Sequence, residues 1–265
     1  MNPKKANVIW ITGASSGIGA ELARLYAQKG WQVALSARSK DKMEELAKQL
    51  DGYHGQGHVF PCDVTDALAV ADTVAQIEKD IGPINLAVLN AGTYVPDTAR
   101  SFTVDNFQLH TRVNMEGTAN CVAPLLKVMK ERKSGHIAIV ASVAGYRGLP
   151  RSLSYGPSKA GLINFAEALA IEGQSFNIKV QVINPGFVET PLTAQNDFDM
   201  PFIISAEKAA RHIEQGLESA KFAIEFPWQM VLMLKTLGLF PARLYFKLVS
   251  KATSSHMTKK DREKS

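Results

Sequence analysis

The stretch VIWITGASSGIGAELARLYAQKG, residues 8–30, decides the fold class. It begins with a short apolar run, VIWIT (8–12), which is typical of a buried strand. It continues from residue 17 with apolar side chains at helical spacing and stops at Gly30. A glycine-rich turn, TGASSGIG (12–19), joins the two parts. Strand, glycine turn and helix in this order indicate the start of an α/β domain.

Short apolar runs and helical segments continue to alternate along the chain. Further strands are expected at 32–37, 58–64, 84–92, 135–142 and 179–186. Helices are expected at 41–50, 66–82, 103–132 and 153–173, and residues 205–226 add a last helix and strand. Near-continuous apolar strands separated by helices indicate a parallel sheet covered on both faces. We therefore predict one Rossmann-type α/β domain over 1–227, a doubly wound parallel sheet of about seven strands with helices on both faces.

The composition excludes several classes of protein. The chain of 265 residues is 46% hydrophobic and 21% charged, which is ordinary for a folded globular protein. Its two cysteines, Cys62 and Cys121, and its six histidines have no metal-ligand spacing, so neither a disulfide framework nor a metal site is expected. No segment has the apolar length of a signal peptide or a membrane span, and a cytoplasmic location is expected.

The net charge of +5 is unevenly distributed along the chain. Residues 228–265 hold eight Lys/Arg and two Asp/Glu, whereas residues 1–227 hold 22 and 23. The body is therefore nearly neutral and the C-terminal segment is basic. Because no basic face is evident in the body, we expect no binding to nucleic acid.

The turn at 12–19 has the spacing G-x-x-x-G-x-G. Gly13 permits the tight turn, and Gly17 and Gly19 let the backbone approach a pyrophosphate at the N-terminus of the following helix. A glycine-rich loop without a ligand is the alternative. Its place between the first strand and the first helix of an α/β chain favours dinucleotide binding.

The residues after the second strand bear on which dinucleotide binds. An acidic residue there bonds the ribose of NAD, whereas arginine accommodates the 2′-phosphate of NADP. This chain has Ala37-Arg38-Ser39, with no carboxylate before Asp41. Arg38 therefore favours NADP(H), unless its side chain simply faces solvent.

Several ordered motifs resemble the short-chain dehydrogenase/reductase family, over about residues 6–226. They are TGASSGIG (12–19), Asp63-Val64, LNAG (89–92), Asn114, Ser142, Tyr155 with Lys159, and PGFVET (185–190). The third motif departs mildly from the family pattern, which usually begins with asparagine where this chain has Leu89. The resemblance implies a nicotinamide-dependent oxidoreductase that acts on carbonyl or alcohol groups.

Tyr155 and Lys159 lie four residues apart in YGPSK (155–159), so a helix would place both side chains on one face. Pro157 suits the first turn of such a helix, because its missing N–H is not needed there. An ammonium group near the phenol, together with the positive ring of an oxidised nicotinamide, favours the phenolate and is expected to lower the pKa of Tyr155. Tyr155 would then serve as the acid or base of the reaction.

The resemblance implies a role for each remaining motif. The Ser142 hydroxyl would bond the substrate oxygen, Lys159 would also bond the nicotinamide ribose, and Asn114 would disturb its helix and hold a water in a proton relay to Lys159. A bonded interior polar residue is the alternative for Asn114. Cofactor contacts are implied for Gly13, Ser15, Ser16, Gly17, Ile18, Gly19, Arg38, Asp63, Val64, Asn90, Ala91, Gly92, Tyr155, Lys159, Pro185, Gly186, Val188 and Thr190.

The segment 228–265 extends beyond the resemblance. Residues 228–240 and 241–252 are expected to form apolar helices, the second with Arg243, Lys247 and Lys251 in one basic stripe, and about the last ten residues to be flexible. The helices could pack on the body or on a sister subunit, where they could cover the substrate cleft. They could instead bind peripherally to an anionic membrane, or bind another protein.

Taken together, the sequence predicts an NADP(H)-dependent reductase of a hydrophobic aldehyde or ketone, with Tyr155 as the proton donor. Oxidation of a secondary alcohol and a non-catalytic NADPH-binding regulator are the alternatives. The long helices near 103–132 and 153–173 predict, by the resemblance, a homodimer or homotetramer.

Overall fold

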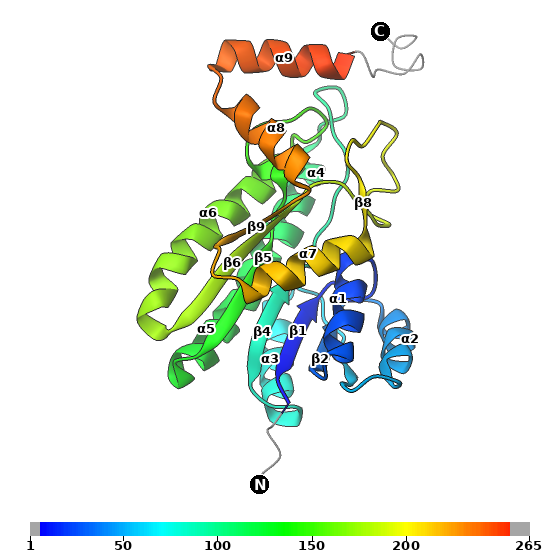
Figure 1. The fold of residues 1–265 in the computed structure, drawn as a ribbon, viewed down its shortest axis with the longest axis vertical. Coiled ribbons are helices and arrows are strands. Elements are labelled where there is room, and N and C mark those ends of the chain that lie inside the picture. The colour runs from blue at the N-terminus through cyan, green and yellow to red at the C-terminus, as the bar shows by residue number, and fades with distance from the viewer. Residues whose placement is uncertain (1–5, 255–265) are drawn as a thin grey trace.

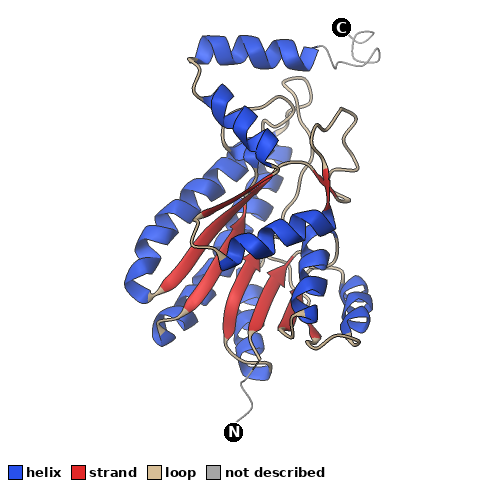
Figure 2. Ribbon diagram, viewed as in Figure 1, coloured by secondary structure: helices blue, strands red, loops and turns tan. Residues whose placement is uncertain are grey.

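The computed structural model describes residues 6–254, as a layered α/β fold (Figures 1 and 2). Seven strands form one parallel sheet in the order β3-β2-β1-β4-β5-β6-β9. They are β1 (Val8–Thr12), β2 (Gln32–Ser36), β3 (Gly57–Val59), β4 (Ile84–Leu89), β5 (Gly135–Val140), β6 (Ile178–Pro185) and β9 (Ala223–Phe226). A separate pair consists of β7 (Val188–Glu189) and β8 (Ile204–Ser205). The predicted doubly wound fold is confirmed.

Helices cover both faces of the sheet (Figure 2). They are α1 (Gly17–Gln28), α2 (Lys40–Leu50), α3 (Ala67–Asp80), α4 (Val104–His110), α5 (Gly117–Arg132), α6 (Tyr155–Gly173), α7 (Ala206–Glu218), α8 (Trp228–Gly238) and α9 (Ala242–Ser254). Buried side chains of α1, α2 and α7 form one core cluster with the sheet, and those of α3, α5 and α6 form the other. The direction of winding reverses between β1 and β4, and ligands of such sheets bind beyond the carboxyl ends of the strands at this point.

Two predicted elements differ in detail from the structure. The strand expected at 58–64 is only Gly57–Val59, and Pro61, which has no N–H for a ladder, follows two residues later. The helix expected at 103–132 is continuous, but Thr111–Glu116 winds as a π-helix between α4 and α5. Such wide turns often occur at functional sites, and this one contains Asn114.

The C-terminal segment leaves the sheet after β9 and forms α8 and α9 at the end of the molecule opposite the N-terminus (Figure 1). The buried residues Met230, Val231 and Leu234 of α8 pack on Val143 and on partly buried side chains that include Phe187. Of the alternatives for this segment, packing on the body therefore holds for one face of α8. The segment predicted to be flexible, about the last ten residues, lies within 255–265, outside the described residues. Between residues 6 and 254, none of the helices has the length and apolar character needed to cross a bilayer.

Candidate active site

A hollow of about 110 Å³ lies beyond the carboxyl ends of the strands, beside the start of α6. Ten residues singled out from the sequence line it: Ile18, Asn90, Gly92, Ser142, Tyr155, Lys159, Pro185, Gly186, Val188 and Thr190. Thr93, Val140, Ala141, Leu192 and Thr193 complete the wall. Segments from five separate parts of the chain thus meet where the fold places its ligand crevice.

Tyr155 is the first residue of α6, and two contacts hold it there. Ser154 precedes it and donates both its backbone N–H, at 3.1 Å, and its hydroxyl to the buried carboxyl group of Asp97. The ring of Tyr94 packs edge-on against the Tyr155 ring, with 4.9 Å between centroids. The loop after β4 therefore fixes both the backbone and the ring of Tyr155.

The phenol of Tyr155 is more strongly protonated than the sequence suggested. Burial raises its pKa from 10.0 to about 12, and a hydrogen bond with Ser142 only partly opposes this shift. In the protein alone, loss of solvent outweighs the favourable contacts of the phenolate. The lower pKa expected when Lys159 and an oxidised nicotinamide act together stays a prediction. At neutral pH the group is a proton donor.

Lys159 lies in the same hollow, with its Nζ 5.6 Å from the centroid of the Tyr155 ring. Its side chain is only 4% exposed and donates a hydrogen bond of 2.8 Å to the carbonyl oxygen of Val140 in β5. Burial lowers the pKa of Lys159 from 10.5 to about 8, because a buried ammonium loses its hydration. It remains mostly protonated at neutral pH.

Ser142 follows β5 directly and caps the short helix Val143–Gly145. Its Oγ accepts a hydrogen bond from the backbone N–H of Ala144 at 3.1 Å and donates to the carbonyl oxygen of Pro185 at 3.3 Å. These contacts hold the hydroxyl in the hollow beside the phenol of Tyr155.

Asn114 sits in the π-helical turn and is fully buried. Its Oδ1 accepts from the backbone N–H of Thr93 at 2.8 Å, and its Nδ2 donates to the carbonyl oxygen of Thr93 and to Ser158 Oγ. The side chain thus ties the loop after β4 to α6. A water-holding role for Asn114 stays a prediction.

The glycine turn adopts the conformation that a pyrophosphate cradle requires. Gly13 and Gly17 have φ angles of 65° and 55°, in the left-handed region that favours glycine. A Cβ on Gly13 would lie 2.9 Å from Asn90 Nδ2, and one on Gly17 would lie 2.9 Å from a methyl carbon of Thr190. A Cβ on Gly19 would clash with the carbonyl oxygen of Gly13. The backbone packs so closely that only glycine fits, and the N-terminus of α1 beside it suits a dinucleotide.

This cradle is fixed to the neighbouring strand. Thr12 Oγ1 accepts hydrogen bonds of 3.0 Å from the backbone N–H groups of Asn90 and Ala91, and Asn90 Nδ2 donates to the carbonyl oxygens of Thr12 and Gly13. Ser15 is half-buried and Ser16 exposed in the same turn. The residues therefore fit the cofactor that the sequence implies.

The part of the site predicted to bind the adenosine end of the cofactor is more exposed to solvent. Arg38 is exposed just after β2, and its charge helps to lower the pKa of Asp63. The larger cause of that shift is hydrogen bonding by Thr65, whose backbone N–H donates to Asp63 Oδ1 at 2.9 Å. Arg112 also contributes to it. Val64 is buried beside this cluster, against Gly117.

Besides Asp97, which holds Ser154, sequence reasoning missed three residues that shape this region. Tyr94 packs on Tyr155, and Thr12 ties the turn to β4. Buried His110 accepts the backbone N–H of Val95 at its Nε2 and so holds the loop that carries Tyr94. Of the three, only Thr12 could have been found from the sequence, because it is a polar residue directly before Gly13 at the end of an otherwise apolar strand.

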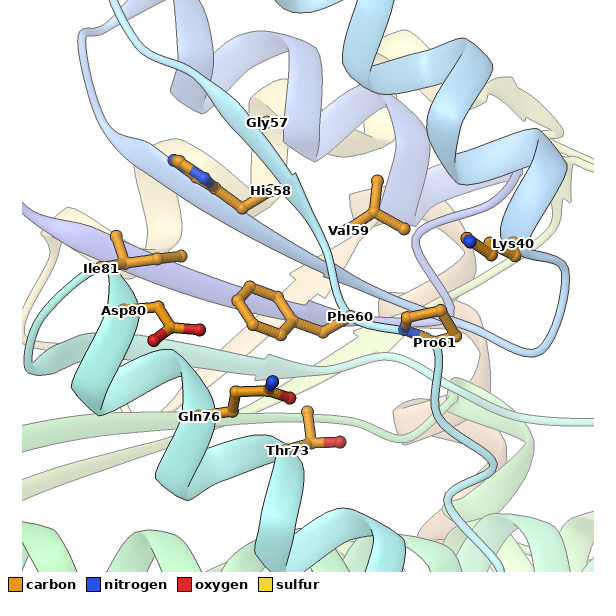
Figure 3. Close-up of a pocket in the computed structure, with 10 residues that line it drawn as sticks. All are labelled: Lys40, Gly57, His58, Val59, Phe60, Pro61, Thr73, Gln76, Asp80 and Ile81. Atoms are coloured by element: carbon orange, nitrogen blue, oxygen red, sulfur yellow. The ribbon is translucent and has the colours of Figure 1, made fainter.

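A larger hollow, of about 660 Å³, lies elsewhere, at the β3 edge of the sheet. Figure 3 shows it between the segment 57–61 and the facing side of α3. None of its lining residues belongs to the predicted site: Lys40, Gly57, His58, Val59, Phe60, Pro61, Thr73, Gln76, Asp80 and Ile81. The smaller hollow is therefore the candidate active site.

The fold supplies a turn that fits a dinucleotide, and the crevice beside it holds a protonated phenol, a hydroxyl and a buried amine. Proton exchange at a carbonyl or alcohol oxygen, next to a bound nicotinamide, is the chemistry for which these groups are suited. The class is thus a nicotinamide-dependent oxidoreductase.

Comparison with known proteins agrees with this class. The family model for short chain dehydrogenase matches residues 7–200. An uncharacterized oxidoreductase of Myxococcus xanthus is 31% identical over 235 residues, covering 89% of this chain and 93% of the relative. The 2,3-dihydro-2,3-dihydroxybenzoate dehydrogenase of Bacillus subtilis is 32% identical and covers 84% of each chain. The chain belongs to the short-chain dehydrogenase family.

Among solved structures, the L-sorbose reductase of Gluconobacter frateurii, complexed with NADPH and L-sorbose, superposes with a TM-score of 0.74. It is 26% identical, and the match covers 84% of this chain and 95% of the reductase. The family acts on CH–OH or C=O groups with a nicotinamide cofactor.

Proposed function

We propose that this protein reduces an aldehyde or ketone to the alcohol with NADP(H). The observation that carries the proposal is that the Ser142 hydroxyl, the Tyr155 phenol and the buried Lys159 amine line one hollow, and burial of Tyr155 favours its protonated form. A phenol that keeps its proton at neutral pH is ready to donate it, whereas oxidation of an alcohol would require the phenolate as base.

In this proposal, the substrate oxygen accepts hydrogen bonds from the hydroxyl groups of Ser142 and Tyr155, which line one hollow. As negative charge develops on that oxygen, Tyr155 transfers its proton to it. The Lys159 ammonium, 5.6 Å from the ring centroid, stabilises the phenolate left behind. A bound nicotinamide supplies the hydride.

The glycine turn would hold the pyrophosphate, and Lys159 would also bond the nicotinamide ribose. Pro185, Gly186, Val188 and Thr190 would orient the nicotinamide, since they line the same hollow as Tyr155 and Lys159.

The preference for NADP(H) rests on the exposed arginine after β2. Along the sequence, no carboxylate follows Arg38 before Asp41, and Arg112 adds a second positive charge near Asp63. Two cations favour a 2′-phosphate over a bare hydroxyl. The NADPH complex of the similar L-sorbose reductase is consistent with this preference.

The walls near the hollow favour a hydrophobic carbonyl compound. Leu192 lines it, and the cluster of Val143, Phe187 and Met230 packs beside Ser142 and Gly186. Apolar walls of this kind bind apolar substrate groups by excluding water.

Oxidation of a secondary alcohol is the second candidate, because the similar Bacillus subtilis protein is named a dehydrogenase. A regulator that binds NADPH without turnover is the third.

Tyr155→Phe separates catalysis from sensing: we expect loss of more than a thousandfold in NADPH-dependent carbonyl reduction, with NADPH binding retained. Tyr53→Phe, at a partly exposed tyrosine outside the site, is the matched control. Unchanged turnover in Tyr155→Phe would refute the proposal.

The direction is tested by pH. Reduction by the wild-type protein should proceed at neutral pH, and oxidation should accelerate as pH rises toward the pKa of Tyr155. Oxidation that is already maximal at neutral pH would favour the second candidate.

We further infer a homodimer or homotetramer through the long helices. Ile171 on α6 and Val104 on α4 are exposed apolar residues on these elements, and the mass in solution tests the assembly. The free, buried thiols of Cys62 and Cys121 favour the reducing cytoplasm.

A further inference from the structure

Exposed apolar side chains gather on the C-terminal helices. Eight of the nineteen exposed large hydrophobic residues found among the described residues lie between Trp228 and Leu248. Monomeric proteins rarely expose such a concentration unless it binds something. The exposed apolar residues of this segment therefore indicate a binding surface.

Both faces of α8 carry apolar side chains, but only one face is covered. Met230, Val231 and Leu234 face the body and are buried. Trp228 and Leu232 lie one turn apart on the opposite face, and Leu239, just beyond the helix, continues that stripe. Trp228 is 69% exposed and Leu239 85%. A helix that only covered the site would have a polar outer face.

α9 adds positive charge beside apolar side chains. Tyr245 is 2% exposed and anchors the helix by donating a hydrogen bond of 2.8 Å to the carbonyl oxygen of Gly148. Phe246, at 63% exposure, and the basic residues Arg243 and Lys247 point away from this anchor into solvent. Neither Arg243 nor Lys247 forms an ion pair with the residues that the structure describes. We call Trp228, Leu232, Leu239, Arg243, Phe246 and Lys247 the tail surface.

The charge of the segment selects among possible partners. Residues 228–254 contain four Lys/Arg and no Asp/Glu. Lys235 is paired with Glu225 at 2.5 Å, which leaves Arg243 and Lys247 to face an external anion. A twofold contact of the tail surface with a second copy would oppose like charges without a carboxylate from this segment. Anionic lipid headgroups complement these charges, and tryptophan is favoured at the lipid–water boundary.

We propose that the tail surface docks the protein peripherally on an anionic membrane. α8 would then lie between the membrane and the active site, because its Met230 packs against Gly186, which lines the hollow. A lipid surface would thus be about one helix diameter from the site.

The test measures binding of the full-length protein to vesicles, without substrate, so the result is independent of the proposed reaction. We expect cosedimentation with phosphatidylcholine vesicles that contain phosphatidylglycerol, little with phosphatidylcholine alone, and release at high NaCl. The variant Arg243→Gln/Lys247→Gln should bind the anionic vesicles about tenfold more weakly or worse. Trp228→Gln/Leu232→Gln should lose a comparable factor through its apolar contacts.

Matched controls change the same chemistry elsewhere. Lys42→Gln/Lys48→Gln removes two exposed charges from α2, and Leu68→Gln replaces an exposed apolar residue of α3. Both controls should bind vesicles as the wild-type protein does. Circular dichroism melting of every variant verifies the fold, and the lipid and salt dependence of the wild-type protein tests the proposal without any substitution.

Absence of vesicle binding by the wild-type protein, or binding that ignores lipid charge and salt, would overturn the proposal. A fall in oligomeric mass of Trp228→Gln/Leu232→Gln, without vesicle binding by the wild-type protein, would assign the surface to a second copy instead.

Discussion

Replacing Lys159 by methionine should change how the stability of the protein depends on pH. The side chain is buried, and its pKa is lowered from 10.5 to about 8. Below about pH 8 the lysine is protonated in both the folded and the unfolded chain, so it adds no pH dependence. Between about pH 8 and 10.5 the unfolded chain holds a proton that the folded one has lost. The contribution of Lys159 to the free energy of unfolding must therefore increase as pH rises through this window.

The size of the gain follows from the two pKa values. Between about pH 7 and 9.5, a fall in pKa from 10.5 to about 8 adds about 2 kcal/mol to the free energy of unfolding. Methionine has a similar length but no proton to exchange. The free energy of unfolding of wild type minus that of Lys159→Met should thus increase by about 2 kcal/mol over this range.

Urea unfolding at both pH values, followed by circular dichroism, measures this difference. Titrating groups away from Lys159 are common to both proteins and cancel in it, and Tyr155, whose pKa is raised to about 12, keeps its proton over this range. Lys42→Met, at an exposed lysine of α2, is the control, and its difference from wild type should be flat. A flat difference for Lys159→Met as well would refute the argument that this amine is a desolvated cation. Lys159→Met should also lose carbonyl reduction.

Three further substitutions test the cofactor site and its support. Gly19→Ala adds a Cβ that falls on the backbone of the turn, so NADPH titration should show binding weakened more than tenfold, whereas Gly52→Ala, with open space around it, should bind normally. Arg38→Asp should lower the ratio of kcat/KM for NADPH to that for NADH at least tenfold, because a carboxylate repels the 2′-phosphate; an unchanged ratio would contradict the role of Arg38. Asp97→Ala leaves Ser154 without its acceptor in a buried site, so urea unfolding should show a loss of about 2 kcal/mol together with a lower kcat.

The fold was predictable because its signals are local. The apolar run 8–12, the glycines of 12–19 and the helical spacing after them lie within one short stretch, and the same alternation repeats to residue 226. The early end of β3 also has a local cause in Pro61, which the prediction did not weigh.

The site was predictable only in part. The positions of Ser142, Tyr155 and Lys159 follow from motifs, and the structure gathers them in one hollow. The pKa of Tyr155 depends on how completely distant segments bury it, among them the loop that carries Tyr94, and no spacing in the sequence reports that burial. Asp97 was missed for the same reason, since its partner Ser154 is 57 residues away.

The C-terminal helices show a similar limit. Apolar residues predicted both of them, but periodicity did not indicate that α8 would bury one apolar face and leave another in solvent.

One arginine connects the C-terminal helices directly to the segment that follows Ser142. Arg147, five residues after Ser142, donates hydrogen bonds from Nη1 to the carbonyl oxygens of Gly238 and Phe240 at 2.8 and 2.9 Å. Its guanidinium lies 3.9 Å from the centroid of the Tyr245 ring in α9. Truncation before α8 would remove both the carbonyl acceptors of Arg147 and the tyrosine ring on which it packs. In a chain shortened in this way, the segment that follows Ser142 would therefore be held less firmly. The last two helices thus help to maintain the structure of the active site, as the sheet does.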